Sequence, residues 1–524
     1  MNCEFLHYPL GEQDFKSIRE EGKVYVDKTS LVYSLVNRYK FVFLSRPRRF
    51  GKSLLLSTIQ AYFEGEKQLF RDLAISQLEK EWTRHPVIHL ELSRHNPSDP
   101  GSLEAIVEEQ FQIWEKIYGV SEIQKTLSAR FARIIRNAFE TTGEKAVVLI
   151  DEYDHPLIGT LSSSKQHTEN RELLKSVYSN LKALDQYIRF AMLTGVTRFS
   201  KTSIFSGINN LTDITFFNEY ADICGFTENE LRTFLHSGIE KLGKENAWTF
   251  DEAVAQLKKF YDGYHFSKKC PDIYNPYSLI RALDRSEISD YWFESGRPSF
   301  LISKLKDTNE PFSRIFQDSA DESTLTESDT AFSSPVSLLF QTGYLTIKGY
   351  DADNQEYLLG IPNTEVEKAL FKGLLARFTG LEKKEATAEA LRLVEFLKKG
   401  EPEKFIENLR IFLHSVPYEA IPRPSERYFQ NLLYLMFRFS NLKVEAEKRT
   451  SYGRSDLIVE TEGYLYVFEL KLDRSAEEAM KQIEEKGYAI PFSHDGRKII
   501  KVGLNFSSAT RNLQDWIILK TYSK

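Results

Sequence analysis

Cysteine is scarce in this chain. Its 524 residues include only three cysteines, Cys3, Cys224 and Cys270, and these lie far apart in the sequence. Such spacing excludes a disulfide framework and a structural zinc site built from paired cysteines. We therefore expect a protein of a reducing compartment.

Long apolar runs are also absent. No uninterrupted apolar run approaches the length of about 18 residues that indicates a membrane-spanning helix. The first eight residues lack the charged start and apolar core of a secretory signal. These two absences predict a cytoplasmic protein without a membrane partner.

An excess of basic residues is missing as well. The 69 Lys and Arg residues are outnumbered by 75 Asp and Glu residues, which leaves a formal net charge of −6. Any contact with nucleic acid must therefore be made by local patches. The hydrophobic content of 41% suffices for sizeable cores, and the length predicts about three or four domains.

The stretch 45–53, SRPRRFGKS, is the strongest local signal. It lies between an apolar run at 41–44, which predicts a buried strand, and residues 54–59, which predict the start of a helix. This is the arrangement of a P-loop, whose backbone N–H groups and helix N-terminus hold a polyphosphate. Lys52 would contact the phosphates of ATP, and Ser53 would bind magnesium. The predicted nucleotide-binding residues are Arg48, Arg49, Phe50, Gly51, Lys52, Ser53 and Leu54.

One position departs from the usual P-loop spacing. The first glycine of the Gly-x-x-x-x-Gly-Lys-Ser/Thr pattern would fall at Arg46, and arginine tolerates a positive φ less well than glycine does. The alternative interpretation is a basic turn between a strand and a helix, without a nucleotide.

A second apolar strand, predicted at 146–150, ends in two acids. In P-loop ATPases, acids in this position coordinate magnesium and activate water, which are the roles predicted for Asp151 and Glu152. Carboxylates beside a buried sheet need a cation or hydrogen bonds to offset their desolvation. The alternative is that these acids merely cap the following helix.

Strands and helices alternate along the first 200 residues. Predicted strands at 87–92 and 188–196 and amphipathic helices at 103–118 and 123–138 join the two strands above, which indicates a three-layer parallel α/β sheet. Thr194 lies near the end of the last strand, and Arg198 follows that strand. We expect Thr194 to sense the γ-phosphate and Arg198 to stabilise the transition state. The alternative is an ordinary strand-ending threonine and a solvated arginine.

The flanking regions give weaker signals. A helix at 31–36 would be capped by Thr29 or Ser30, and Thr227 with Glu230 predicts a capping box before paired helices. Residues 226–300 would form a helical lid or a winged-helix-like unit. Residues 321–329 are expected to be a solvated loop, 344–347 and 357–360 strands, and 364–416 helices.

Near the C-terminal end, a hairpin is predicted from 455–460, a turn at Glu462 and Gly463, and 464–471. Its two-residue turn places Asp456 opposite Glu469 to within one register step, and the alternation of side chains puts Lys471 on the same face as Glu469. Two carboxylates and a lysine suit phosphodiester hydrolysis, with Asp456 and Glu469 as magnesium ligands.

Two helices flank the hairpin in the sequence. Glu426 begins the upstream helix and would supply a third acid, and Gln482 on the downstream helix would brace the site. The alternative is an ordinary edge strand that carries Glu and Lys two positions apart. Basic residues near the two sites would contact phosphates or be solvated surface: Arg48, Arg49, Lys448, Arg449 and Arg454.

As a set, these motifs resemble a bacterial and archaeal family that joins an AAA-ATPase-like N-terminal domain to a C-terminal PD-(D/E)XK nuclease superfamily domain. The resemblance covers nearly the whole chain, and the loop with Arg46 suits that family. It implies an ATP-binding domain like those of regulatory ATPases with a nuclease-like domain as effector. The residues that carry it are 25–29, 46–53, 149–154, 193–197, 205–214, 453–456, 468–471 and 482–488.

The sequence therefore predicts an α/β multidomain protein that couples a magnesium-dependent ATPase to a nuclease acting on DNA. A rival hypothesis is a nucleotide-switched module that binds nucleic acid or protein without cutting, and a third is an ATPase whose nuclease fold is only a scaffold. Self-association is left open. The expected domains are a P-loop ATPase domain at 1–225, the lid unit at 226–300, a mostly helical connecting region at 301–416 and a nuclease-like domain at 417–524.

Overall fold

A computed structural model gives the structure of the chain. It describes residues 7–96, 99–119, 125–161, 163–198, 204–205, 208, 210–292, 299–306, 308, 310–316, 319–326, 334–421, 423–450 and 453–521. Cys3, three residues of the 205–214 motif (Ser206, Gly207 and Asn209) and residues 327–329 of the predicted loop lie outside these ranges. The chain divides into two units, residues 1–296 with 319–365 and residues 297–318 with 366–524. The predicted boundaries at 225, 300 and 416 stay predictions.

The first unit is built on a five-stranded sheet in the order β2-β3-β4-β1-β5, in which every pair is parallel. The interior strands β1 and β3 are entirely buried and are apolar up to their last residue, as strands covered on both faces require. Strand β4 lies between β1 and β3, so the P-loop strand and the acidic strand are not neighbours. The strands are β1 (Phe41–Ser45), β2 (Val87–Glu91), β3 (Ala146–Asp151), β4 (Ile188–Gly195) and β5 (Thr212–Asp213).

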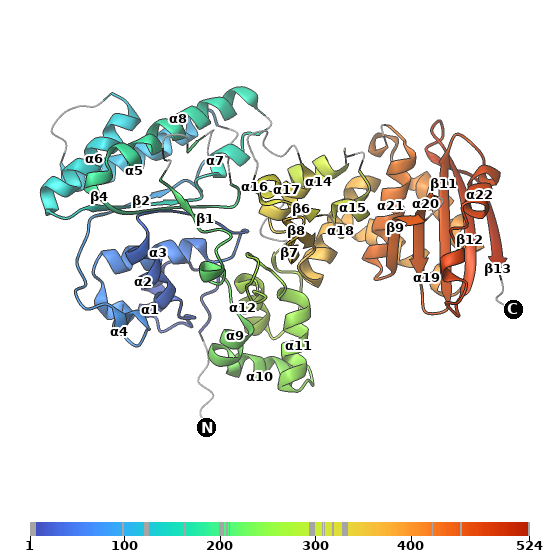
Figure 1. Cartoon of the computed structure of the whole chain (residues 1–524), viewed down its shortest axis with the longest axis horizontal. Helices are drawn as coiled ribbons and strands as arrows, with labels where there is room; N and C mark the ends of the chain where they lie inside the picture. The colour runs from blue at the N-terminus through green and yellow to red at the C-terminus, as the bar shows by residue number, and fades with distance from the viewer. Residues whose placement is uncertain are drawn as a thin grey trace. The chain divides into compact units, whose positions relative to one another are not determined.

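Helices cover both faces of this sheet, which confirms the predicted three-layer fold (Figure 1). One face carries α5 (Ser102–Tyr118), α6 (Leu127–Thr142), α7 (His155–Ile158) and α8 (Ser164–Ala183). The other face carries α1 (Phe15–Glu20), α2 (Thr29–Arg38), α3 (Lys52–Phe63) and α4 (Ile75–Leu78). A cluster of buried apolar side chains from β1 to β4 and α5, α6 and α8 forms the core on the first of these faces.

A helical region follows the sheet, and its own apolar core lies among its helices. The predicted capping box of Thr227 and Glu230 is present at the start of the first helix. The helices are α9 (Glu228–Phe234), α10 (His236–Glu245), α11 (Phe250–Tyr261) and α12 (Pro276–Arg285). A small three-stranded sheet in the order β6-β8-β7 completes the first unit. Its elements are β6 (Ser319–Ala320), α16 (Glu322–Thr326), α17 (Pro335–Gln341), β7 (Thr346–Asp351) and β8 (Glu356–Gly360).

Two local predictions are wrong. Helix α2 begins at Thr29, and neither Thr29 nor Ser30 is its N-cap. Instead, Asp27 Oδ1 accepts hydrogen bonds from Thr29 N at 2.8 Å and from Thr29 Oγ1 at 2.6 Å, because a carboxylate is the stronger acceptor. Residues 322–326 are helical rather than a loop, because Leu325 is buried and holds the turn against α17.

The second unit consists of helices around a five-stranded sheet in the order β13-β12-β11-β10-β9. In this sheet only β11 and β12 pair in parallel. The helices are α14 (Ser299–Lys306), α15 (Phe312–Ile315), α18 (Thr364–Thr379), whose first two residues belong to the first unit, α19 (Lys383–Lys398), α20 (Pro402–Ser415), α21 (Glu426–Phe439) and α22 (Ala476–Glu485). The strands are β9 (Lys443–Thr450), β10 (Gly453–Glu460), β11 (Tyr464–Leu472), β12 (Lys498–Ser507) and β13 (Asn512–Thr521).

The predicted hairpin is formed by β10 and β11. Leu457 pairs with Phe468 and Glu460 with Leu465, so the register places Asp456 opposite Glu469 as expected. Helix α22 packs on β11 and β12, and α21 packs against β9, β10 and β11. Among the described residues, no helix is long and apolar enough to cross a membrane.

The aromatic segment at 261–266 provides a test of the packing in the first unit. Gly263 has φ +90°, and a Cβ added there would lie 2.4 Å from the carbonyl oxygen of Pro362. We predict that Gly263→Ala lowers the free energy of unfolding by about 2–4 kcal/mol, because backbone strain and a clash with backbone add up. Gly143→Ala is the control, since Gly143 also has a positive φ but open space around it. Thermal melting of both variants should show the larger loss for Gly263→Ala, and equal losses would contradict the prediction.

Candidate functional site

The loop between β1 and α3 has the geometry of an anion-binding turn. Gly51 is the N-cap of α3 with φ +91°, and its position has no side-chain cap, which leaves the N–H groups of the first helical turn available to a ligand. Lys52 is buried and its Nζ donates to the carbonyl oxygens of Arg46 at 3.0 Å and Pro47 at 3.1 Å. Burial lowers the pKa of Lys52, opposed by the charges of Glu152 and Asp151. An incoming phosphate would offer this ammonium an anionic partner in place of two neutral carbonyls.

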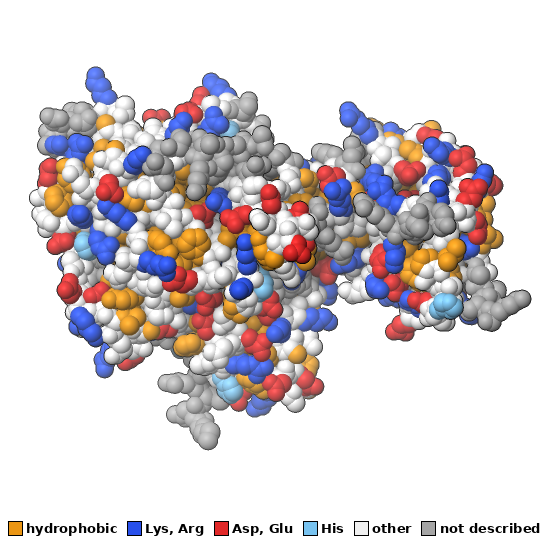
Figure 2. Space-filling model, in the orientation of Figure 1, with side chains coloured by type: hydrophobic (Ala, Val, Ile, Leu, Met, Phe, Trp, Pro, Cys, Tyr) orange, Lys and Arg blue, Asp and Glu red, His pale blue; other side chains and the backbone are white. Residues whose placement is uncertain are grey.

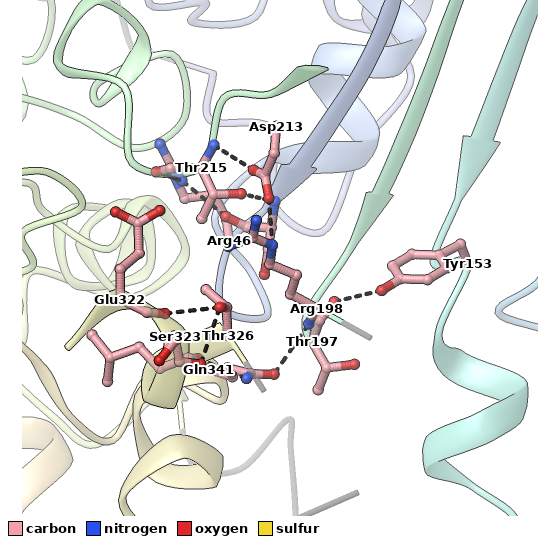
Figure 3. Close-up of polar contacts among 12 residues, drawn as sticks. Arg46, Tyr153, Thr197, Arg198, Asp213, Thr215, Glu322, Ser323, Thr326 and Gln341 are labelled. Atoms are coloured by element: carbon pink, nitrogen blue, oxygen red, sulfur yellow. Dashed lines mark hydrogen bonds and ion pairs between the residues drawn. The ribbon is translucent and has the colours of Figure 1, made fainter. Parts of the chain in front are cut away.

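Arg46, which replaces the first glycine of the usual P-loop pattern, has a structural role in this loop. The left-handed residues of the loop are Arg49, with φ 68°, and Gly51, so position 46 does not require a glycine. The Arg46 guanidinium is buried and donates to the carbonyl oxygens of Ser45, Thr215, Tyr220 and Ala221, at 2.8 to 3.4 Å. Figure 3 shows Arg46 beside Thr215. The ring of Phe266 lies 4.3 Å from the guanidinium carbon. Arg46 therefore joins the end of β1 to the segment after β5.

A cavity of about 370 Å³ opens beside the loop. All seven predicted nucleotide-binding loop residues, from Arg48 to Leu54, line it together with Glu152 and His155. The helical region contributes Leu235, Pro276, Tyr277 and Ile280 to the lining. The other lining residues include Pro9, Gly11, Glu12, Gln13, Val24, Tyr25, Val26, Lys28, Ile223, Cys224, Gly225 and Phe226. The volume and the mixture of apolar walls with convergent polar groups are those of a small-molecule site.

The acidic motif at the end of β3 is held by hydrogen bonds. Asp151 is 4% exposed, and its Oδ1 accepts from Thr194 Oγ1 at 2.6 Å and from Glu152 N at 3.0 Å. The Thr194 hydroxyl is therefore engaged with Asp151 and orients it. Glu152 has a left-handed backbone with φ 50°, and its side chain reaches the nucleotide cavity. Burial raises the pKa of Glu152 and the charge of Lys52 opposes the rise.

Two residues that sequence analysis left without a role complete this motif. Asp154 Oδ2 accepts from Val196 N at 3.0 Å, Thr197 N at 2.5 Å and Thr197 Oγ1 at 2.6 Å. Tyr153 donates its hydroxyl proton to the carbonyl oxygen of Thr197 at 2.9 Å (Figure 3). These bonds fasten the turn that carries Glu152 to the end of β4. In the sequence, these contacts were indicated only by the further acid, Asp154, that follows Asp151 and Glu152.

Arg198 lines a different cavity from the one beside the P-loop. Its Nε forms an ion pair of 2.5 Å with Asp213 Oδ2, and its backbone N–H donates to Gln341 Oε1 at 3.1 Å (Figure 3). It lines a different cavity, which Arg46 and Gln341 also line, and it is absent from the described lining of the cavity beside the P-loop. Because a carboxylate on β5 holds its side chain, Arg198 links β5 to α17 in this structure.

The second candidate site lies on the β10–β11 hairpin. Glu469 is 1% exposed and its Oε1 accepts from Lys471 Nζ at 2.9 Å. Glu469 Oε2 faces the backbone of the other strand, where Asp456 N lies 3.4 Å away, and Asp456 Oδ2 accepts from Leu470 N at 2.7 Å. The structure therefore brings the two predicted acids and the lysine together at one place on the sheet.

The charge of this pair is only partly compensated. Burial raises the pKa of Asp456 to about 6 and that of Glu469 to about 8, and the mutual repulsion of the two carboxylates adds to the rise for Glu469. Lys471 opposes both rises with a single positive charge. Carboxylate oxygens are the ligands that magnesium prefers, so the donor chemistry of the pair fits a divalent cation.

The flanking helices contribute differently. Glu426 lies in the first turn of α21, where its charge adds to the effect of burial on the pKa of Asp456. Among the described residues, no group of three or more His, Cys, Asp or Glu is arranged to hold a metal ion, so Glu426 does not complete a three-acid cluster. Gln482 Nε2 donates to the Tyr488 hydroxyl at 3.3 Å, which also accepts from Arg454 N at 3.2 Å.

Other polar residues at the hairpin were missed by sequence analysis. Gln430 on α21 donates through Nε2 to the carbonyl oxygen of Asp456 at 3.0 Å. Glu447 on β9 pairs with Arg427 at 2.6 Å and with Arg454 at 3.0 Å. These contacts become visible only when α21, β9 and β10 pack together in the structure.

The predicted basic residues near the hairpin have acidic partners. Lys448 pairs with Glu445 at 2.6 Å and Arg454 with Glu447, and the side chain of Arg449 lies outside the described part. Figure 2 shows the same mixture more widely, with basic and acidic side chains interspersed over the visible face. A phosphate contact here would have to compete with these carboxylates.

Comparisons with known proteins match both ends of the chain. Residues 9–205 match a family described as predicted AAA-ATPase, and residues 424–516 match the PD-(D/E)XK nuclease superfamily. A protein of Azotobacter chroococcum mcd 1, described as an uncharacterized protein in the vnfD 5' region, is 33% identical over 521 residues, which cover 97% of this chain and 98% of that protein. A solved structure of Aeropyrum pernix Orc1 in complex with DNA covers 66% of this chain and 91% of its own, with 11% identity and a TM-score of 0.24. That TM-score is too low to support an argument.

The carboxylate pair predicts a dependence of stability on pH. The folded-state pKa values of about 6 and about 8 exceed the ordinary carboxyl values, so the unfolded chain loses these protons first as the pH rises. Without magnesium, the free energy of unfolding should therefore fall between about pH 4 and 8, by at most about 1.4 kcal/mol per pH unit for each group.

Thermal melting across this pH range, with and without magnesium, provides the measurement. Asp456→Asn removes one charge of the pair and should flatten the profile, and added magnesium should restore stability to the wild type mainly at the alkaline end. A wild-type profile identical to that of Asp456→Asn would show that the pair does not titrate as described.

Proposed function

Because the chain belongs to the family that joins an AAA-ATPase-like domain to a PD-(D/E)XK nuclease superfamily domain, we propose that it is a magnesium-dependent ATPase coupled to a nuclease that cuts DNA. The observation that carries the proposal is that each matched domain brings several of its predicted catalytic residues to one place. Lys52, Ser53 and Glu152 line one cavity, and Asp456, Glu469 and Lys471 meet on one hairpin.

At the N-terminal site, we assign phosphate binding to the N–H groups of the loop and to Lys52. Ser53 and Asp151 would hold magnesium, since one lies at the start of α3 and the other at the carboxyl end of β3. Glu152 would accept a proton from the attacking water, and its raised pKa suits a base that must also release that proton. Thr194 keeps Asp151 in place through their hydrogen bond of 2.6 Å.

At the C-terminal site, Asp456 and Glu469 would hold magnesium, which supplies Lewis-acid polarisation of the phosphodiester when it is bound. Lys471 would position the attacking water and stabilise the developing negative charge, because its Nζ already lies 2.9 Å from Glu469. Gln482 would act indirectly, through the Tyr488 hydroxyl that fixes Arg454 N. Glu426 would tune the charge of Asp456 from the first turn of α21.

One observation favours a second candidate, a nucleotide-switched module that grips nucleic acid without cutting. The described residues provide two acids rather than three at the hairpin, and Lys471 is bound to one of them. The two candidates differ in whether magnesium-dependent cleavage occurs at all.

For the ATPase, we predict that Lys52→Ala abolishes nucleotide binding, because it removes the only cation inside the first turn of α3. Glu152→Gln should keep ATP binding and lower hydrolysis at least about 100-fold, since it removes the proton acceptor and little else. Calorimetric titration and phosphate release give the two readouts. Glu169→Gln, at an exposed glutamate of α8, is the control that should match the wild type. Full hydrolysis by Glu152→Gln would contradict the assignment.

For the nuclease, we predict magnesium-dependent cleavage of labelled DNA that Asp456→Asn or Lys471→Ala lowers at least about 100-fold while binding survives. The control is Lys481→Ala, because Lys481 is an exposed lysine of α22. Assays on single- and double-stranded DNA and RNA, with and without ATP, identify the substrate and show whether ATP regulates cutting. Binding without cleavage on every substrate would support the non-cutting module instead.

A further inference from the structure

Lys28 is a charged residue of the nucleotide cavity to which the proposed mechanism gives no role. It lies immediately before α2 and is only 8% exposed, yet its side chain is part of the cavity wall that Lys52 and Ser53 also line. A lysine is rarely buried to this extent without a partner.

The partners of Lys28 come from the segment that leads into the helical region. Lys28 Nζ lies 2.6 Å from Glu230 Oε1 and 2.7 Å from Glu230 Oε2, and 3.8 Å from Asp222 Oδ2. Glu230 is also the acidic member of the capping box of α9, where its Oε2 accepts from Thr227 N at 2.9 Å and from Thr227 Oγ1 at 3.0 Å. One ion pair thus ties Lys28, which precedes α2 and lines the cavity, to the first turn of α9.

Lys28 acts on the same region of the cavity as the P-loop lysine. Burial raises the pKa of the Cys224 thiol, and Arg46, Lys52 and Lys28 each oppose that rise by their charge. Cys224 lines the cavity, so Lys28 and Lys52 both lie within electrostatic range of one point on its wall. A polyphosphate held at the P-loop would therefore lie in the field of both ammonium groups.

The capping box makes an exchange of partners inexpensive for Glu230. If Lys28 turns to another anion, Glu230 Oε2 still accepts two hydrogen bonds from Thr227, and its side chain is 16% exposed, so its charge is not left buried and unpaired. A nucleotide phosphate is a suitable competitor because it carries several negative charges and lysine binds phosphate as a point charge. The neutral acceptors of a nucleobase would not displace a carboxylate.

We propose that Lys28 is a second phosphate-binding cation of the nucleotide site and that Glu230 holds it in reserve until a nucleotide enters. The inference rests on the proposed nucleotide-binding function of this cavity. Transfer of Lys28 from Glu230 to the phosphate would loosen the tie between α2 and α9. Nucleotide binding would thereby be signalled to the helical region.

Competition between Glu230 and phosphate for Lys28 predicts effects of opposite sign. Lys28→Met should weaken ATP binding about 10-fold or more, because a charge-assisted contact is lost. Glu230→Gln should strengthen ATP binding several-fold, since glutamine also serves in a capping box but does not compete for the ammonium. In the double variant, the gain from Glu230→Gln should vanish, because there is no lysine to release. General damage to the fold would instead weaken binding in both single variants.

The measurement is calorimetric titration of the full chain with ATP, ADP and adenosine in magnesium. ATP and ADP should respond to Glu230→Gln, and adenosine should not, because it carries no phosphate. Unchanged or weaker ATP binding by Glu230→Gln, or an equal gain for adenosine, would overturn the inference. Lys52→Ala separates the two proposals. If Lys52→Ala no longer binds ATP while Glu230→Gln binds ATP as the wild type does, only the inference about Lys28 fails. If the wild type itself binds no ATP, both the inference and the proposed function fail.

Discussion

Buried charge on or next to the strands of a sheet is the constraint on which both candidate sites depend. A carboxylate in a protein interior is stable only if hydrogen bonds or a cation offset its lost hydration. In the first unit, the protein itself supplies the donors: Asp151 receives the Thr194 hydroxyl and a backbone N–H, and Asp154 receives three donors from the end of β4. These bonds make the acidic turn rigid before any ligand arrives.

In the hairpin of the second unit, a lysine contributes to offsetting the charge of the carboxylates. Lys471 is bonded to Glu469 and lies within electrostatic range of Asp456, and burial keeps the pKa values of both carboxyl groups raised against this positive charge. An incompletely neutralised pair of oxygen ligands is what a divalent cation can stabilise. The two sites therefore differ. Neutral hydrogen-bond donors already hold the acids at the end of β3 in place, whereas the acids of the hairpin would be stabilised by a bound cation.

Arg46 shows how an unusual sequence can preserve a familiar loop. Its guanidinium donates to four carbonyl oxygens and lies against one aromatic ring, while its Nε has no hydrogen-bond partner among the described residues. The left-handed turns that a glycine-rich loop needs are made at Arg49 and Gly51 instead. Arginine at position 46 lacks the backbone freedom of glycine, but its side chain connects β1 to the segment after β5.

The sequence by itself determined the layered α/β fold, the P-loop, the acidic strand end and the hairpin register, because each depends on local periodicity and on the spacing of a few residues. The predicted helix cap at Thr29 or Ser30 was wrong because Asp27 is the better acceptor, and the predicted loop was wrong at residues 322–326 because Leu325 is buried there. Only the tertiary structure decided that Thr194 serves Asp151, that Arg198 pairs with Asp213, and that Lys28 meets Glu230, 202 residues later. Those partners come together through strand order and helix packing, and no local pattern encodes which distant charge a buried side chain will meet.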